Sequence, residues 1–314
     1  EKVTGNGGNS STEGSTEKKG GGLKSSGLSR EERLLKEDVD NTFLDQREYV
    51  KDSKGVGGIY YSNAPIIAAN DLQNQKDDFF SATKSGISIG SFDGLHKGHR
   101  VLLKTLVENC SKNKWKSGVV TFERPLPSIK HSSDYSGDIS TLSQRLFLFE
   151  SLGIDFVIIA DFTEDFASLK GVDFLSLLVK QCNMAFLAEG VDFRCGYKGA
   201  TDTSAIKYWA SQNKVQCQFV NPAFYMEGTD QEERISSSFI RQMVQKSFFT
   251  TVCQLLERPY EIDLETIKKI GKCNQVLPAD GVYSVKDEKG DICRLKIQNG
   301  KIAKAPESKK IVFY

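Results

Sequence analysis

Two of the three histidines in this chain, His96 and His99, lie close together in the stretch GSFDGLHKGHR, Gly90 to Arg100. An apolar segment typical of a strand runs into this stretch, and residues with helical spacing follow it. The start of a helix offers unpaired N–H groups to a phosphate, and imidazoles can donate further hydrogen bonds to its oxygens. Glycine lets the backbone approach a ligand closely. The sequence therefore predicts a phosphate-binding loop with glycines at Gly90, Gly94 and Gly98.

Other kinds of site fit this stretch less well. The P-loop pattern GxxxxGK[ST] and the dinucleotide pattern GxGxxG are both absent from it. A metal site would need further ligands, and nothing near His96 and His99 completes a coordination set. Two histidines on a surface turn remain as the alternative without a function.

A second candidate site is RISSSFIRQMV, Arg234 to Val244. Serines at Ser236–Ser238 are good helix-capping residues, and Arg241 follows one turn later on the same side. The planar guanidinium of arginine suits phosphate oxygens. The pattern predicts a second group of phosphate ligands, and an ordinary helix cap is the alternative.

The elements that would position these residues alternate between strands and helices. Short apolar strands are expected at 87–92, 117–122, 154–160, 184–190 and 215–220, and helices at 98–110, 139–153, 171–182 and 203–213. Thr141 and Gln144 resemble a capping box, and Gly153 ends that helix. This alternation predicts an α/β fold, a doubly wound parallel sheet with helices on both faces.

Composition divides the rest of the chain. Residues 1–53 read as a disordered, low-complexity arm with a short helix after Ser29, and residues 54–84 are an uncertain lead-in. The α/β domain spans 85–260. Residues 261–314 predict a small antiparallel β module, with turns at Lys289–Gly290 and Asn299–Gly300.

The overall charge gives no support to binding of nucleic acid. Forty-two Lys and Arg nearly balance forty-one Asp and Glu, for a net charge of +1. No apolar run is long enough to span a membrane, and no secretory signal is visible. We expect a cytoplasmic protein with no membrane or nucleic-acid partner, although the sequence leaves a removed targeting segment or an organellar location open.

Together the motifs resemble those of the bacterial FAD synthetase family of HxGH nucleotidyltransferases, whose adenylyltransferase domain is Rossmann-like. FDGLHKGH is similar to the HxGH signature in the form this family uses, and RISSSFIRQMV is similar to its ISSTxIR motif. EGVDFRCGYKG, Glu189 to Gly199, resembles the family's G-x-DFxFG loop. QLLERPY, Gln254 to Tyr260, resembles its L-G-R-P-Y junction, with Glu257 in place of Gly.

The resemblance implies transfer of AMP from ATP to FMN, which gives FAD and pyrophosphate in FAD biosynthesis. It implies catalytic roles for His96, His99 and Arg241, and Mg²⁺ carried by the ATP phosphates without a dedicated ligand cluster. The ATP-binding residues it implies are Gly90, Ser91, Phe92, Asp93, Gly98, Ser236, Ser237 and Ser238. The flavin-binding residues are Asp192, Phe193, Arg194 and Pro125. Two implied roles stay open: Asp93 either positions Mg-ATP or hydrogen-bonds the turn, and Phe193 either faces the flavin or packs inside.

The chain departs from the family in two places. The family commonly shows TFxPxP after the second strand, where this chain has TFERPLP with its first proline displaced to Pro125. The bifunctional family members also continue into a riboflavin kinase barrel with a GRxLGFPTAN-like entry motif, which this sequence lacks. QVLPADGVYSV, Gln275 to Val285, is similar to a later kinase strand, so residues 261–314 read as a kinase remnant without kinase activity or, alternatively, as an unrelated β cap.

Two other functions compete with FAD synthesis. One is transfer of a nucleotide to a different acceptor, such as a sugar or polyol phosphate, by another HxGH nucleotidyltransferase. The other is binding of flavin or nucleotide by a protein that has lost catalysis. The flavin-type loop disfavours the first, and the intact His96, His99 and Arg241 disfavour the second.

Overall fold

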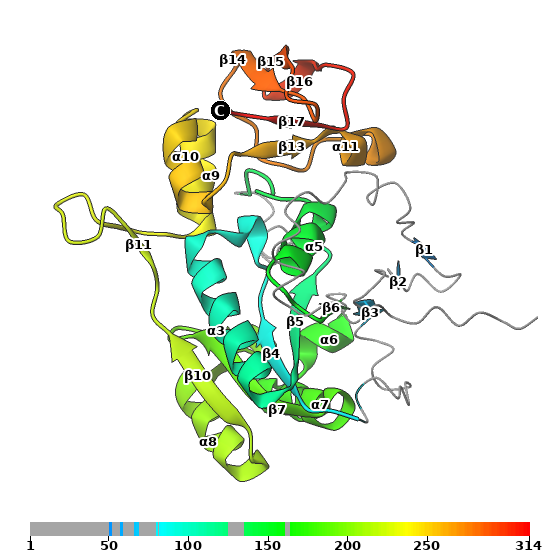
Figure 1. Cartoon of the computed structure of the whole chain (residues 1–314), viewed down its shortest axis with the longest axis vertical. Helices are drawn as coiled ribbons and strands as arrows, with labels where there is room; N and C mark the ends of the chain where they lie inside the picture. Colours follow the sequence, from blue (N-terminus) through cyan, green and yellow to red (C-terminus); the bar gives the residue numbers. More distant parts are fainter. Residues whose placement is uncertain are drawn as a thin grey trace, which may run out of the picture. The chain divides into compact units, whose positions relative to one another are not determined.

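The computed structural model describes residues 80, 82–124, 135–160 and 164–314, together with the backbone of three earlier strands (Figure 1). These strands are β1 (Val50–Lys51), β2 (Gly57–Gly58) and β3 (Ile66–Ala68). All of these residues belong to one compact unit, Val39–Tyr314. β1 falls within residues 1–53, the arm that the sequence predicts to be disordered. The rest of that arm, including the helix predicted after Ser29, and the predicted flavin ligand Pro125 lie outside the described residues.

A parallel sheet of six strands forms the centre of this unit. Its order is β10-β7-β4-β5-β6-β3, and every neighbouring pair in it is parallel. The other five strands are β4 (Ser85–Ile89), β5 (Lys116–Phe122), β6 (Phe156–Ala160), β7 (Met184–Gly190) and β10 (Gln216–Val220). These five confirm the predicted strands, and β3 adds an edge strand from the lead-in.

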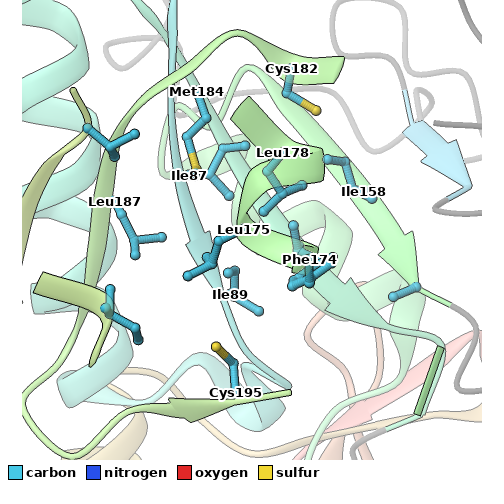
Figure 2. Packing of buried hydrophobic residues seen from close by; sticks show 14 of the residues in the cluster. Ile87, Ile89, Ile158, Phe174, Leu175, Leu178, Cys182, Met184, Leu187 and Cys195 are labelled. Atoms are coloured by element: carbon cyan, nitrogen blue, oxygen red, sulfur yellow. The ribbon is translucent and has the colours of Figure 1, made fainter. Parts of the chain in front are cut away.

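Helices cover both faces of this sheet, which confirms the doubly wound α/β prediction. On one face, α3 (Lys97–Asn113) and α5 (Leu142–Ser151) share a buried cluster with β5 and β6. On the other face lie α7 (Gly171–Cys182) and α8 (Thr203–Asn213), with the short α6 (Glu164–Ser168) preceding α7. Figure 2 shows Leu175 and Leu178 of α7 beside Ile87 and Ile89 of β4. Burial on both faces explains why the strands are continuously apolar.

Local signals set the helix ends as the sequence predicts. The Thr141 side chain accepts a hydrogen bond from the backbone of Gln144, whose own side chain accepts one from the backbone of Thr141. This reciprocal pair is a capping box, and it fixes the start of α5. The helix ends just before Gly153, which has a φ of 78°.

The rest of the chain forms short elements around the sheet and a C-terminal module. The short elements are two antiparallel pairs of strands and two 3₁₀ turns: β8 (Arg194–Cys195) with β9 (Thr201–Asp202), β11 (Phe224–Tyr225) with β12 (Glu233–Arg234), η2 (Asp93–Leu95) and η3 (Tyr197–Gly199). Two helices, α9 (Ser237–Gln245) and α10 (Phe249–Leu256), lead to the module. None of the helices among the described residues is long and apolar enough to cross a membrane.

The C-terminal module is an antiparallel sheet of order β13-β17-β14-β15-β16 with the helix α11 (Leu264–Ile270). Its strands are β13 (Glu261–Asp263), β14 (Gly281–Lys286), β15 (Ile292–Gln298), β16 (Lys301–Lys304) and β17 (Lys310–Val312). The predicted turns at Lys289–Gly290 and Asn299–Gly300 join β14, β15 and β16, and β13 and β17 extend the sheet. The C-terminal module shares a buried hydrophobic cluster with α9 and α10, and in this cluster the rings of Phe249 and Phe313 stack with their centroids 4.1 Å apart. The division of the chain at residue 260 stays a prediction.

Candidate active site

The chain changes direction across the sheet at β4. From β4 it proceeds to β5 and β6 on one side, and it then returns to β7 on the other side. Ligands of open α/β sheets bind beyond the carboxyl ends of the strands at such a switch point. Backbone pairing of β4 with β7 extends only to Ile87 and Leu187, and the amide N–H of Ile89 instead donates to the side chain of Glu189 at 2.6 Å. The two strands therefore part where the GSFDGLHKGH stretch begins.

His96 and His99 form a stacked pair at the start of α3. Their rings lie 3.7 Å apart with an interplanar angle of 17°, and the Nδ1 atom of His96 accepts a hydrogen bond from the backbone N–H of His99. The ring of Phe92 also packs edge-on against that of His99, with 5.4 Å between the ring centroids. The Nδ1 atom of His99 is buried and has no hydrogen-bond partner among the described residues. One imidazole atom is thus left with unused hydrogen-bonding capacity.

The surroundings keep both imidazoles uncharged. Burial, together with the positive charges of Arg258, Arg234 and Arg241, lowers the pKa of His96 to about 4. Burial, followed by the influence of His96, lowers the pKa of His99 well below its ordinary value. At neutral pH each ring is therefore a neutral imidazole with one N–H to donate.

Asp93 is buried beneath this loop and binds protein groups on three sides. It is 2% exposed, and its carboxylate accepts hydrogen bonds from the backbone N–H groups of Ile139 at 2.9 Å and Ser140 at 3.0 Å. It also forms an ion pair with the Nη2 of Arg241. Of the two roles that the sequence leaves open for Asp93, this geometry favours holding the turn over contacting Mg-ATP.

Arg241 is likewise held by the protein. Its Nε donates to the carbonyl of Gly137 at 2.7 Å, its Nη2 donates to Asp93 and Tyr135, and its guanidinium lies 4.7 Å from the Tyr135 ring. Its Nη1 makes no hydrogen bond with the described part of the chain. The predicted contact of Arg241 with ATP phosphates therefore stays a prediction, because two of its three nitrogens already have protein partners.

The serine motif reaches the same loop from a distance in the sequence. Ser236 caps α9 by accepting a hydrogen bond from the backbone N–H of Phe239 at 3.2 Å. Ser237 donates to the carbonyl of Asp93 at 3.1 Å across 144 positions, whereas Ser238 is exposed. The fold thus brings the two motifs together, and the helix cap that the sequence offers as the alternative role is present.

The predicted flavin loop is arranged differently from the predicted phosphate loop. Asp192 forms an ion pair with Arg234 at 2.6 Å, and the Nε of Arg194 donates to the carbonyl of Gly199 within its own loop at 2.7 Å. Phe193 is half-buried and packs against the core under α7 and α8, which favours its alternative role in packing. Contact of these residues with a flavin stays a prediction.

Two arginines at the site were not predicted from the sequence. Arg258 follows Glu257 in the junction motif, and its Nη2 donates to the carbonyl of Gly94 at 2.7 Å. Arg145 of α5 is fully buried, and its Nη1 donates to the Ser91 carbonyl, the Thr121 hydroxyl and the Phe122 carbonyl. Neither arginine pairs with a carboxylate in the described residues. The junction motif was a signal for Arg258, whereas a single arginine on an amphipathic helix gives none for Arg145.

Glu257 shows why the junction motif carries glycine in the family that it resembles. It lies at the end of α10 with a φ of 55°, in the left-handed region that favours glycine. The chain keeps this conformation with a glutamate, whose carboxylate pairs with Arg100 at 3.2 Å.

Carboxylates, histidines and cysteines form no group of three or more that could hold a metal ion in the described residues. The remaining predicted nucleotide ligands lie in the same loop and contact neighbouring protein groups. Gly90 donates its N–H to the Val120 carbonyl at 2.9 Å, Phe92 is buried with a φ of 47°, and Gly98 lies next to the His96 ring. The arrangement offers neutral N–H donors and positive charge to an anionic ligand at the switch point.

The chain is similar to known proteins along the part that builds this site. The sequence pattern of the FAD synthetase family matches residues 80–239, just over half of the chain. The bifunctional riboflavin kinase/FMN adenylyltransferase of Escherichia coli K12 is 30% identical over 214 residues, which cover 63% of this chain and 66% of that protein. The protein of the same name from Buchnera aphidicola (Schizaphis graminum) is 28% identical over 193 residues, covering 60% and 61%.

These matches span less than two thirds of the length of either relative. A crystal structure of a macrolide-efflux protein from Streptococcus pneumoniae superposes with a TM-score of 0.62, covers 79% of this chain and 89% of that one, and is 20% identical. That likeness concerns the fold alone. By the match to the family pattern over residues 80–239, the chain belongs to the FAD synthetase family.

Proposed function

We propose that this chain transfers the AMP group of ATP to FMN and releases pyrophosphate. An oxygen of the FMN phosphate attacks the α-phosphorus of ATP, and the bond from that phosphorus to the bridging oxygen of the β-phosphate breaks. The leaving pyrophosphate keeps this oxygen and its electron pair. No covalent intermediate with the protein is required, so the protein contributes positioning and stabilisation of charge.

The observation that carries this proposal is the neutral His96–His99 pair at the switch point. Two N–H donors beside the start of α3 would bind the ATP phosphates and stabilise the charge that develops on pyrophosphate. The unused Nδ1 of His99 supports this, because a buried polar atom without a partner is costly unless a ligand satisfies it. The charges of Arg258, Arg234 and Arg241 near His96 attract the same anionic ligand.

The other parts of the site have supporting roles in this proposal. Mg²⁺ enters with ATP, bound to its phosphates, as part of the substrate. Ser237 and Arg241 hold the loop, and the Nη1 of Arg241, which has no hydrogen-bond partner among the described residues, would contact phosphate. The 189–199 loop would face the flavin through Asp192 and Arg194. A cytoplasmic location, inferred from the sequence, accompanies the proposal.

The test is a set of parallel incubations of the purified chain. ATP, Mg²⁺ and FMN should yield FAD and pyrophosphate in equal amounts, measured by chromatography and a coupled pyrophosphate assay. CTP with glycerol 3-phosphate should yield nothing, and turnover of this pair in place of FMN would move the chain to another acceptor class. Binding of FMN and ATP without release of pyrophosphate would favour a protein that has lost catalysis.

A further inference from the structure

A short segment, residues 135–141, supports the phosphate loop from below. The backbone N–H groups of Ile139 and Ser140 donate to Asp93, and the Ser140 hydroxyl accepts from the N–H of Gly94 at 2.9 Å. The side chain of Ile139 packs on Gly94 so closely that a Cβ added there would lie 2.8 Å from its Cγ2. The position of this segment therefore sets the position of the loop that carries His96.

The C-terminal module holds the same segment from its other side. The N–H of Asp138 donates to the carbonyl of Asn274 at 2.7 Å, and the N–H of Val276 donates to the carbonyl of Asp138 at 2.8 Å. Gly137 permits this approach, since a Cβ there would lie 2.6 Å from the Val276 nitrogen and its φ is +124°. The backbone of residues 274–276 is thus joined directly to the segment that binds Asp93.

The side chain of Gln275 ties this junction together. It is 4% exposed, and its Nε2 donates to the carbonyls of Ile139 at 3.1 Å and Glu261 at 2.8 Å. The same nitrogen lies 3.1 Å from the Oε1 of Gln144 in the capping box of α5. Its Oε1 accepts the N–H of Asp263 at 2.7 Å. One buried amide therefore links β13, the start of α5 and the 135–141 segment.

A second contact repeats this link. The Thr141 hydroxyl donates to Asp263 at 2.8 Å, and Asp263 also accepts from the N–H and hydroxyl of Thr266 in α11. These groups are buried or half-buried, so each bond that is lost leaves a polar atom without water to replace its partner. These hydrogen bonds therefore hold the 135–141 segment in one position relative to the C-terminal module.

We propose that the C-terminal module is a positioning element of the nucleotide site and that Gln275 is its positioning residue. The path passes from Gln275 to Ile139, from Ile139 to Asp93 and Gly94, and then to His96 two residues further on. This inference rests on the proposed adenylyl transfer, and it gives the module a use that needs no second active site. The module contacts neither substrate in this proposal; it acts through the 135–141 segment.

The competing explanation is that the module only stabilises the fold. A matched control separates the two, because Ser308 is buried in the same module and its hydroxyl bonds, among the described residues, to Glu288 and Lys310 of the module alone. Gln275→Leu keeps similar volume and removes the link, while Ser308→Ala weakens the module away from the segment. The activities of the variants are compared at temperatures equally far below the unfolding midpoint of each variant, so that differences in stability do not affect the comparison.

The first measurement is steady-state FAD formation. A displacement of about 1 Å at a reacting group can cost on the order of a hundredfold, so we expect Gln275→Leu to lose about ten- to a hundredfold in kcat. Its KM for FMN should stay within about twofold, and Ser308→Ala should keep kcat within about twofold of wild type. Equal kcat values for Gln275→Leu, Ser308→Ala and wild type would overturn the proposal.

The second measurement does not depend on activity. The chain has only three histidines, so imidazole nitrogen NMR can follow His96 through a pH titration. In wild type its pKa is lowered to about 4 by burial and by the nearby arginine charges, and in Gln275→Leu it should rise towards its ordinary value as the loop becomes more exposed to water. An unchanged titration with normal folding would also refute the proposal. A wild-type chain that forms no FAD would instead refute the proposed function, and this measurement would still decide the role of Gln275.

A milder pair of variants covers failure of Gln275→Leu to fold. Thr141→Val removes the hydroxyl that reaches Asp263 and also caps α5, whereas Thr141→Ser keeps both contacts. The proposal requires a lower kcat and a raised His96 pKa in the first variant alone. The same kinetics and titration in both would contradict it.

Discussion

The buried ion pair between Asp93 and Arg241 gives the sharpest test of how the site is built. Their side chains are 2% and 8% exposed, and they join positions 148 residues apart. We expect Arg241→Met to destabilise the protein by about 3–5 kcal/mol, because removal of one partner leaves a buried charge uncompensated. Total stabilities are about 5–15 kcal/mol, so the loss should be plain in urea unfolding. Asp93→Asn should cost a similar amount.

A double-mutant cycle isolates the pair. The variant with both substitutions should lose less stability than the sum of the two single variants, because neither charge then remains buried alone. The exposed ion pair of Asp192 with Arg234 is the control, and Asp192→Asn should cost about 1 kcal/mol or less. A different result would contradict this reasoning: each single variant loses less than about 1 kcal/mol of stability, the two losses add in the double variant, and Arg241→Met raises the KM for ATP. Arg241 would then bind the phosphates and contribute little to the fold.

Three further outcomes are expected. His99→Ala should fold normally yet lose on the order of a hundredfold in kcat, and near-normal FAD formation would contradict the role given to the histidine pair. The pKa of His96 is about 4 in the folded chain against 6.5 for the unfolded one, so the unfolded chain takes up a proton first as pH falls. Stability should therefore drop by about 2 kcal/mol between pH 7.5 and 5, measured as the difference from His96→Gln, and an identical pH dependence in both would refute the burial argument. The chain should form no FMN from riboflavin and ATP, and appearance of FMN in proportion to purified protein would show a kinase site that its motifs do not reveal.

Most of the fold was predictable because its signals are local. The apolar strands, the period of the helices and the capping box of Thr141 and Gln144 lie within a few residues of one another, so short stretches of sequence carry them. The start of α3 at the histidine pair was predictable for the same reason. The strands β13 and β17 were not, because each has three residues and exists through pairing with distant segments.

The arrangement inside the site was less accessible to the sequence. The sequence predicted that the HxGH-like and serine motifs bind one ligand. It did not predict that Asp93 and Arg241 form an ion pair with each other. Whether an arginine binds phosphate or a carboxylate depends on which groups the fold brings within reach, and those groups are far away in the chain. Gln275 illustrates the same limit, since its four partners lie on three separate segments.

The distribution of charge under the loop connects the state of the histidines with the ligand that they would bind. Arg145 is fully buried and Arg258 is half-buried, neither forms an ion pair with a carboxylate in the described residues, and burial lowers the pKa of both. The carboxylates of Asp93 and Asp138 favour the charge of Arg145, and that of Glu261 favours the charge of Arg258, but burial outweighs them. An anion beside the loop would therefore stabilise both cations further. The positive charge of Arg258 also keeps His96 neutral in the absence of ligand. In the proposed function, a triphosphate would add negative charge beside these cations and accept hydrogen bonds from the same imidazoles.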